Sequence, residues 1–145
     1  MAMSDKLKGI TQEEWRQLGY YYERDDANKK WVIVASPFGI KLFVNQLLAY
    51  ANNEKNRSKS QHEHWGPYSY LKIMTLDEPG IDEHSIHGSL LDLKKLANII
   101  KENLHDDLIN KSLKIKDEYS KNCRYALEIM IKDYGFDPSS QDKQL

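Results

Sequence analysis

The sequence has little of what several protein classes require. Its 145 residues contain a single cysteine, Cys123, which cannot form an internal disulfide, and this argues against a disulfide-stabilised secreted domain. No run reaches the roughly 18 apolar residues of a membrane-spanning helix. The first residues, MAMSDKLKGI, also lack the apolar stretch of a signal peptide. We therefore expect a cytoplasmic protein that has no membrane partner.

An excess of charge of one sign is missing too. Lys and Arg number 21, and Asp and Glu number 22, which gives a formal net charge of −1. No overall field draws such a chain toward a polyanion, so the charge argues against a nucleic-acid partner.

Catalytic motifs are scarce. The seven glycines are scattered, so no Gly-rich loop follows a strand to hold a phosphate, and no G-x-S-x-G sequence presents a nucleophilic serine. We therefore expect no cofactor and, with metal chemistry set aside, no enzyme.

The spacing of apolar residues in the first third predicts a hairpin followed by a helix. Aromatic and β-branched residues fill 20–22 and 31–34, and a polar stretch separates the two runs, a pattern typical of a β-hairpin. Ser36 and Pro37 then offer a helix N-cap and a first-turn proline. Apolar residues follow at helical spacing as far as Ala51.

A second unit of strands and helix is predicted in the middle of the chain. Residues 71, 73 and 75 alternate with residues 70, 72 and 74 as in a strand, and a short strand is expected over residues 84–87. Ser89 is the expected N-cap of the next helix, with Asp92 in the capping-box position. Apolar residues at helical spacing continue to Leu104.

Residues 108–132 allow two interpretations. By composition the segment is rich in Lys, Glu and Leu and passes as a helix. Residues 113–119 and 125–131, however, alternate with a period of two, which favours a closing β-hairpin.

Together these elements predict one α+β domain over residues 1–145. Three hairpins would give an antiparallel sheet of about six strands with two main helices packed on it. Thr11, with Glu14 in the capping-box position, predicts a short helical turn before the first hairpin. Residues 1–9 and 138–145 are expected to be loose.

The segment 60–88 holds four of the five histidines. His62 and His64 are two residues apart, so in a strand both imidazoles project to the same side, as two ligands of one zinc ion would. His84 or His87 would have to supply the third ligand. An alternative therefore stays open, a zinc-dependent, hydrolase-like enzyme that uses His62, His64 and His84. Histidines of a loop, exposed or hydrogen-bonded, are the simpler interpretation.

Four carboxylates lie within seven residues around Pro79, namely Asp77, Glu78, Asp82 and Glu83. Such a cluster is often only a solvated turn. We expect, however, that the four cannot all find partners inside the domain, and we interpret them as a negative patch that complements a basic partner surface.

A family resemblance covers the run from His62 to Leu96, particularly HEHWGPYSYLKIMT and HSIHGSLLDLKKLANII. This run, within residues 62–100, resembles the small bacterial immunity proteins found beside polymorphic and contact-dependent toxins. Many of these have a strand carrying I-x-G, followed by Ser and a helix rich in Asp and Leu. The resemblance implies a cytosolic, non-enzymatic protein that binds a cognate toxin and blocks its active site.

The expected contact surface combines the histidine loop with the acidic turn. Aromatic side chains are good anchors because they bury much area at a small cost in entropy. The residues that we predict to contact the partner are Glu63, Trp65 and Tyr68 as the polar and aromatic anchor, and Asp77, Glu78, Asp82 and Glu83 as the charged complement.

Overall fold

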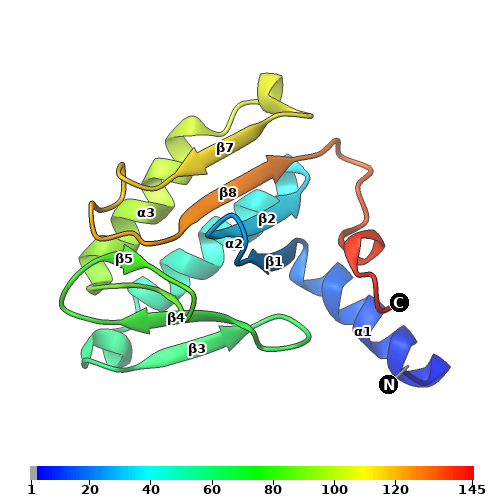
Figure 1. Ribbon diagram of the computed structural model, residues 1–145, viewed down its shortest axis with the longest axis horizontal. Coiled ribbons are helices and arrows are strands. Elements are labelled where there is room, and N and C mark those ends of the chain that lie inside the picture. The colour runs from blue at the N-terminus through cyan, green and yellow to red at the C-terminus, as the bar shows by residue number, and fades with distance from the viewer. Residues whose placement is uncertain (1–2) are drawn as a thin grey trace.

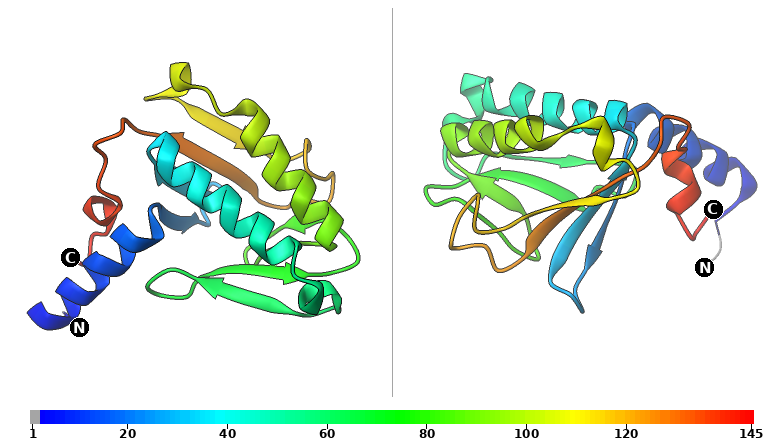
Figure 2. Two further views of the ribbon diagram at one scale, coloured as in Figure 1. Left: turned by 180° about the vertical axis from the view of Figure 1, so that it is seen from behind. Right: turned by 90° about the horizontal axis from the view of Figure 1, so that it is seen from above.

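Two helices, α2 and α3, lie side by side against one face of the strands in the computed structural model, which describes residues 3–145 (Figure 1). Seen from above, these helices form one layer and the strands form a second layer beneath them (Figure 2). The elements are α1 (Asp5–Leu18), β1 (Tyr21–Asp25), β2 (Lys30–Ala35), α2 (Pro37–Ala51), η1 (Glu54–Arg57), β3 (His62–Trp65), β4 (Leu71–Thr75), β5 (Gly80–Ile81), β6 (Ile86–Gly88), α3 (Leu90–Asn103), η2 (Asp106–Leu108), β7 (Ser112–Ile115), β8 (Ala126–Ile131) and η3 (Pro138–Gln141), where η marks a 3-10 helix.

The strands form two mixed sheets, and the prediction of one antiparallel sheet of about six strands is wrong. One sheet has the strand order β1-β2-β8-β7 and the other has the order β3-β4-β6-β5. Most neighbours are antiparallel, but β2 pairs with β8, and β4 with β6, in parallel. Parallel neighbours are not joined by a tight turn, so the local patterns that reveal a hairpin cannot reveal them. The coarser prediction of an α+β fold is confirmed.

The first and last hairpins are confirmed, whereas the middle hairpin is wrong, because β4 and β6 pair in parallel. β1 and β2 are antiparallel, and so are β7 and β8, so residues 108–132 do not form one helix. The short strand expected at residues 84–87 is β6, shifted toward the start of α3. It lies between β4 and β5, because the chain passes first to the edge of the sheet and then returns.

Both main helices begin where the sequence predicted. The Ser36 hydroxyl accepts a hydrogen bond from the backbone N–H of Gly39 at 3.2 Å, and Pro37 is the first residue of α2. Ser89 and Asp92 form a capping box at α3, with side-chain to backbone hydrogen bonds of 3.1 and 2.9 Å. These caps satisfy backbone donors that the first turn of a helix leaves free.

The N-terminal segment is more regular than the sequence predicted. Residues 1–9 were expected to be loose. Residues 1–2 lie outside the described residues, but residues 5–9 are helical, because α1 begins at Asp5. Ser4, and not Thr11, is the N-cap, and its hydroxyl accepts a hydrogen bond from the N–H of Leu7 at 3.2 Å. Thr11 lies inside the helix and is buried.

The C-terminal segment, residues 138–145, is also not a loose tail. It forms η3 and packs beside α1 (Figure 1). Arg16 forms an ion pair of 2.9 Å with Asp137, and Trp15 donates a hydrogen bond of 2.9 Å to the buried Asp142. These partners lie more than 120 residues apart in sequence, so no local pattern predicts them.

The core fills the space between α2, α3 and the inner faces of the two sheets. β2 is buried along most of its length because it lies between β1 and β8. Fully enclosed side chains of the core include Ile33, Ile40, Phe43, Leu47, Leu71, Ile73, Leu93, Leu96 and Ile129. Among the described residues, no helix combines the length and the apolar character that crossing a lipid bilayer requires.

The two sheets are joined where β5 passes the start of β8. The backbone N–H groups of Arg124 and Tyr125 both donate to the carbonyl oxygen of Ile81, at 2.9 and 3.0 Å. This junction brings the turn after β5 next to the β1–β2 hairpin, and it thereby positions the surface described next.

Candidate interaction surface

The histidines of the central segment do not form one site. His62 and His64 are neighbours on the exposed strand β3, with ring centroids 5.2 Å apart, and the Nδ1 atom of each lies 3.0 Å from a backbone carbonyl oxygen. His84 follows β5, at the opposite edge of the sheet, and lies 3.5 Å from Glu83. His87 uses its Nδ1 for a hydrogen bond of 2.8 Å to a serine hydroxyl two residues before it.

The alternative zinc site is therefore not assembled. The expected ligands His62, His64 and His84 come from opposite edges of a four-stranded sheet. Within residues 3–145 there is no group of three or more His, Cys, Asp or Glu side chains that could hold a metal ion.

The predicted aromatic anchor is divided between the core and the surface. Trp65 is only 5% exposed and packs edge-on against Phe43 at a centroid distance of 6.2 Å, so it belongs to the core. Its indole N–H donates to the exposed Glu63 at 2.9 Å. Tyr68 is half-buried and lines a pocket.

The predicted acidic patch is divided in the same way. Asp77 and Glu78 are exposed before β5, and Asp77 lies 3.5 Å from Lys59. Asp82 and Glu83 follow β5, are half-buried and have other neighbours. The four carboxylates are therefore two pairs in different surroundings.

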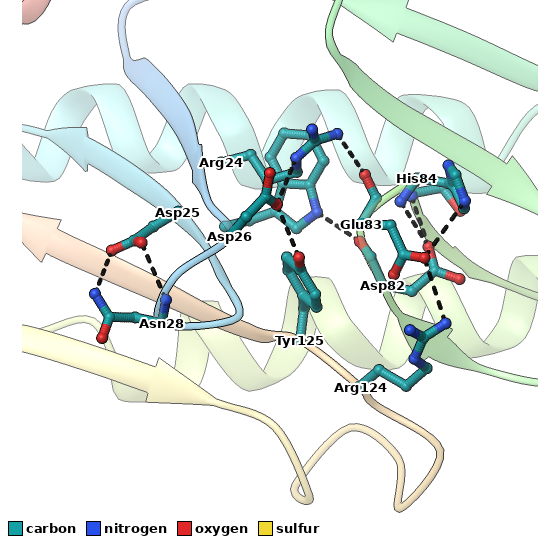
Figure 3. A network of polar contacts seen from close by, with 11 residues as sticks. Arg24, Asp25, Asp26, Asn28, Asp82, Glu83, His84, Arg124 and Tyr125 are labelled. Carbon is teal, nitrogen blue, oxygen red and sulfur yellow. Dashed lines mark hydrogen bonds and ion pairs between the residues drawn. The ribbon is translucent and has the colours of Figure 1, made fainter.

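Asp82 and Glu83 belong to a group of polar residues that we call the turn network, shown in Figure 3. The network lies where the turn after β5 meets the β1–β2 hairpin and the start of β8. Its members are Arg24, Asp26, Asp82, Glu83, Arg124 and Tyr125.

Backbone and side-chain bonds hold the turn in the network. The Asp82 carboxylate accepts hydrogen bonds from the backbone N–H groups of His84 and Ser85, at 2.8 and 3.0 Å, as in an Asx-turn. Its carbonyl oxygen accepts the indole N–H of Trp31 at 2.7 Å. The carbonyl oxygen of Glu83 accepts from the Arg24 guanidinium at 2.8 Å. The turn is therefore fixed to the first sheet.

Apart from Asp82, the charged side chains of the network are paired with a side chain of opposite charge. Arg24 contacts Asp26 at 2.8 Å, and the Tyr125 hydroxyl donates to the same carboxylate at 2.7 Å. The hydrogen bonds from Tyr125 and Arg24 lower the pKa of Asp26. Glu83 Oε1 lies 3.3 Å from Arg124, whereas Oε2 is enclosed and accepts no hydrogen bond from the described residues.

Next to the turn network is a concave site that we call the tyrosine pocket. Its volume is about 350 Å³, which is at the lower end of the range of about 300 to 1,000 Å³ for ligand pockets. Its walls come from α1, β1, β2, the loop between β3 and β4, and the C-terminal segment. The lining residues are Trp15, Tyr21, Tyr22, Glu23, Arg24, Trp31, Tyr68, Tyr70, Asp142, Lys143 and Gln144.

Aromatic rings in contact form the walls of the pocket. The ring of Trp15 lies 4.9 Å from that of Tyr21 and 5.2 Å from that of Tyr22, and the rings of Tyr68 and Tyr70 are 5.8 Å apart. The Tyr22 hydroxyl accepts the backbone N–H of Tyr70 at 3.1 Å. These distances are typical of favourable ring pairs, so the walls support one another.

A glycine allows the loop between β3 and β4 to approach this wall. Gly66 has a φ of +90°, and a Cβ atom at this position would lie 2.2 Å from a ring carbon of Tyr22. A side chain at this position would therefore both strain the backbone and displace a wall of the pocket.

A buried carboxylate forms the floor of the pocket. Asp142 is 8% exposed, and its Oδ2 atom accepts hydrogen bonds from the indole N–H of Trp15 at 2.9 Å and from the hydroxyl of Tyr68 at 2.6 Å. The backbone N–H of Gln144 donates to the other oxygen at 2.9 Å. Three donors thus satisfy the carboxylate.

The sequence pointed to part of this surface only. Tyr68, Asp82 and Glu83 were predicted contact residues and lie on it, whereas Trp15 and Asp142 were missed. The aromatic run 20–22 was a signal, but its composition was used only to predict a strand, and composition does not give the side on which each ring lies. Comparison with protein-family models, with curated proteins and with solved structures gives no match.

Proposed function

We propose that this protein is a non-enzymatic binding domain that recognises another protein, and that its partner is a toxin that it neutralises. The observation that carries the proposal is that the tyrosine pocket and the turn network share a wall. Arg24 and Trp31 line the pocket, and each also bonds to the turn after β5. One continuous face therefore offers a concave aromatic site beside exposed charges.

Such a face has the composition of a protein-binding site. Tyr, Trp and Arg are the residues that most often dominate the energy of an interface, and they do so where a pocket excludes water. Tyr70 is 67% exposed at the rim, so its ring is free to be covered by a partner. The binding energy would then come from the pocket and its rim.

The internal bonds of the face favour tight binding. The turn is fixed by the Asp82 carboxylate, and the pocket walls by Tyr22 and Asp142. Groups that are already ordered lose little conformational entropy when a partner binds.

Charges of both signs on the face would orient the partner. Asp26 and Glu83 lie next to Arg24 and Arg124 in the turn network. An alternating pattern of this kind attracts only a surface with the opposite arrangement, which provides specificity more than affinity. The resemblance of residues 62–96 to immunity proteins supports a toxin as the partner.

The proposal is tested with the product of the toxin gene nearest to the gene for this protein. Co-expression should rescue cells from that toxin, and the purified proteins should form a complex in calorimetry. Tyr70→Ala should weaken the complex about tenfold or more, because it removes a rim aromatic. Tyr134→Ala is the matched control, because Tyr134 is equally exposed, at 61%, and lies outside the pocket.

Two results would contradict the proposal. One is the absence of both rescue and complex formation. The other is an equal effect of the Tyr70→Ala and Tyr134→Ala substitutions, which would place the contact away from this face.

A further inference from the structure

The floor of the tyrosine pocket carries a negative charge that is not part of an ion pair within the described residues. Asp142 forms no ion pair with any of residues 3–145, and its three hydrogen-bond donors are neutral groups. Neutral donors stabilise a buried carboxylate but leave its charge in place, and the low dielectric of a buried site makes that charge felt strongly.

A second carboxylate lies in the wall. Glu23 is an exposed residue of β1 that forms no ion pair with the described residues. Of the two cations that line the pocket, Arg24 is already paired with Asp26 at 2.8 Å, whereas Lys143 is exposed and, like Glu23, forms no ion pair with the described residues. Burial, together with the carboxylates of Glu23 and Asp142, raises the pKa of Tyr21 to about 12.

The aromatic rings, like the carboxylates, favour a cation in the tyrosine pocket. The face of a Tyr or Trp ring carries negative quadrupole charge and attracts cations within about 6 Å of its centroid. The protein already contains one such pair at the pocket wall, because the guanidinium carbon of Arg24 lies 5.9 Å from the ring centre of Trp31. Aromatic faces and carboxylates together form a site for a cation that also has apolar surface.

We propose that the tyrosine pocket binds the guanidinium group of an arginine side chain that the protein partner presents. This inference rests on the proposed function. A guanidinium is planar and weakly hydrated, so it stacks on the Tyr rings, and its forked N–H groups match the Glu23 carboxylate. A lysine ammonium is a compact, strongly hydrated charge and fits a ring-lined pocket less well.

The pocket chemistry can be tested without the partner. N-acetyl-arginine amide is titrated into the protein, and the indole N–H resonances of Trp15 and Trp31 are followed by NMR. The neutral analogue N-acetyl-citrulline amide has nearly the same shape, and N-acetyl-lysine amide has the same charge. We expect saturable shifts with the arginine compound in the millimolar range, at least fivefold tighter than with either of the other compounds.

Three outcomes would overturn the inference. No shift with the arginine compound shows that the pocket does not take a guanidinium. Equal affinity for the citrulline compound shows that charge plays no part. Equal affinity for the lysine compound shows that the pocket does not select a guanidinium.

Substitutions test whether the arginine compound binds in the tyrosine pocket. Glu23→Gln should weaken binding of the arginine compound about threefold to tenfold, because it removes one carboxylate and keeps the shape. Glu102→Gln is the matched control, since Glu102 is exposed near the end of α3 and lies outside the pocket. Equal binding by the Glu23→Gln and Glu102→Gln variants would overturn the role of the Glu23 carboxylate.

The two proposals fail in different experiments. If the toxin complex forms and Tyr70→Ala weakens it while the arginine compound causes no shift, only the guanidinium inference is lost. If the arginine compound binds but no toxin is neutralised, the pocket chemistry stands and the proposed function is lost.

Discussion

Two aspartates of one sequence cluster have different roles at the scale of single residues. Asp82 accepts hydrogen bonds from two backbone N–H groups of its own turn. Asp77 is exposed, and the lysine that lies 3.5 Å from it is exposed as well. Asp82→Ser should therefore lower the free energy of unfolding by about 1 to 2 kcal/mol, since it shortens the acceptor that closes the turn. Asp77→Ser should change it by less than about 0.5 kcal/mol. Urea unfolding of both variants measures the difference.

Equal losses for the two variants would contradict this account. They would mean that the Asp82 turn contributes no more to stability than a solvated loop. If Asp82→Ser is the more destabilising variant, as expected, a test of the negative patch in partner binding should replace Asp77 and Glu78, because these two can be replaced without removing the bonds of the turn.

The sequence could predict which kinds of side chain the surface would contain better than it could predict where each side chain lies. The alternation in β3 places Trp65 on one face of the strand and His62 and His64 on the other, and in the structure Trp65 is buried while both histidines are exposed. The alternation does not show which of the two faces lies against the helices. Trp65 was therefore expected at the surface and lies in the core. Tyr68 follows the strand, where no alternation applies, and its place in the pocket depends on a carboxylate 74 residues away.

At the scale of elements, two helical glycines should respond in opposite ways to alanine. A Cβ atom at Gly39 would lie 2.1 Å from the carbonyl oxygen of Gly19 and 2.9 Å from the Cβ of Ala35, so the first turn of α2 would have to move. Gly39→Ala should lower the free energy of unfolding by about 1 to 3 kcal/mol. Gly9, within α1, has no atom within 4 Å of such a Cβ. Gly9→Ala should raise stability by about 0.5 to 1 kcal/mol.

Thermal or denaturant unfolding of the two variants gives the sign of each change in the free energy of unfolding directly. A stable Gly39→Ala variant would show that α2 does not approach the end of α1 as closely as described. A destabilised Gly9→Ala variant would show that this part of α1 is not helical.

Helix starts could be predicted where a cap precedes a strongly apolar face, as at Ser36 and Ser89. The start of α1 could not. Its first turns carry few core residues and a glycine, so local patterns favoured the capping-box sequence that begins at Thr11. The helix is stabilised instead by packing against η3, which residues 138–141 supply from the other end of the chain.

At the scale of the whole molecule, the parallel pairing of β2 with β8 makes folding depend on residues near the C-terminus. β8 lies between β2 and β7, and β2 is almost wholly buried. A chain of residues 1–111 would leave the inner strand β2 without a neighbour on one side. We expect it to show no cooperative unfolding transition by circular dichroism.

A chain of residues 1–137 is the matched control. It keeps β8 and loses η3 and Asp142, so it should still unfold cooperatively, with a stability lower by about 1 to 3 kcal/mol. Cooperative unfolding of the 1–111 chain would mean that the first sheet does not need β8. The sequence could not predict this dependence, because pairing between strands almost 100 residues apart leaves no local pattern.

The bond between Trp15 and Asp142 has a further consequence for order at the ends of the chain. A local opening of α1 would carry Trp15 away and remove one of the three hydrogen-bond donors of Asp142, so one event would remove a wall of the tyrosine pocket and weaken its floor. Binding of a group in the tyrosine pocket and the packing of α1 against η3 are therefore thermodynamically linked. Any group that fills the pocket lowers the population of the opened form and protects α1 and η3 together from local unfolding.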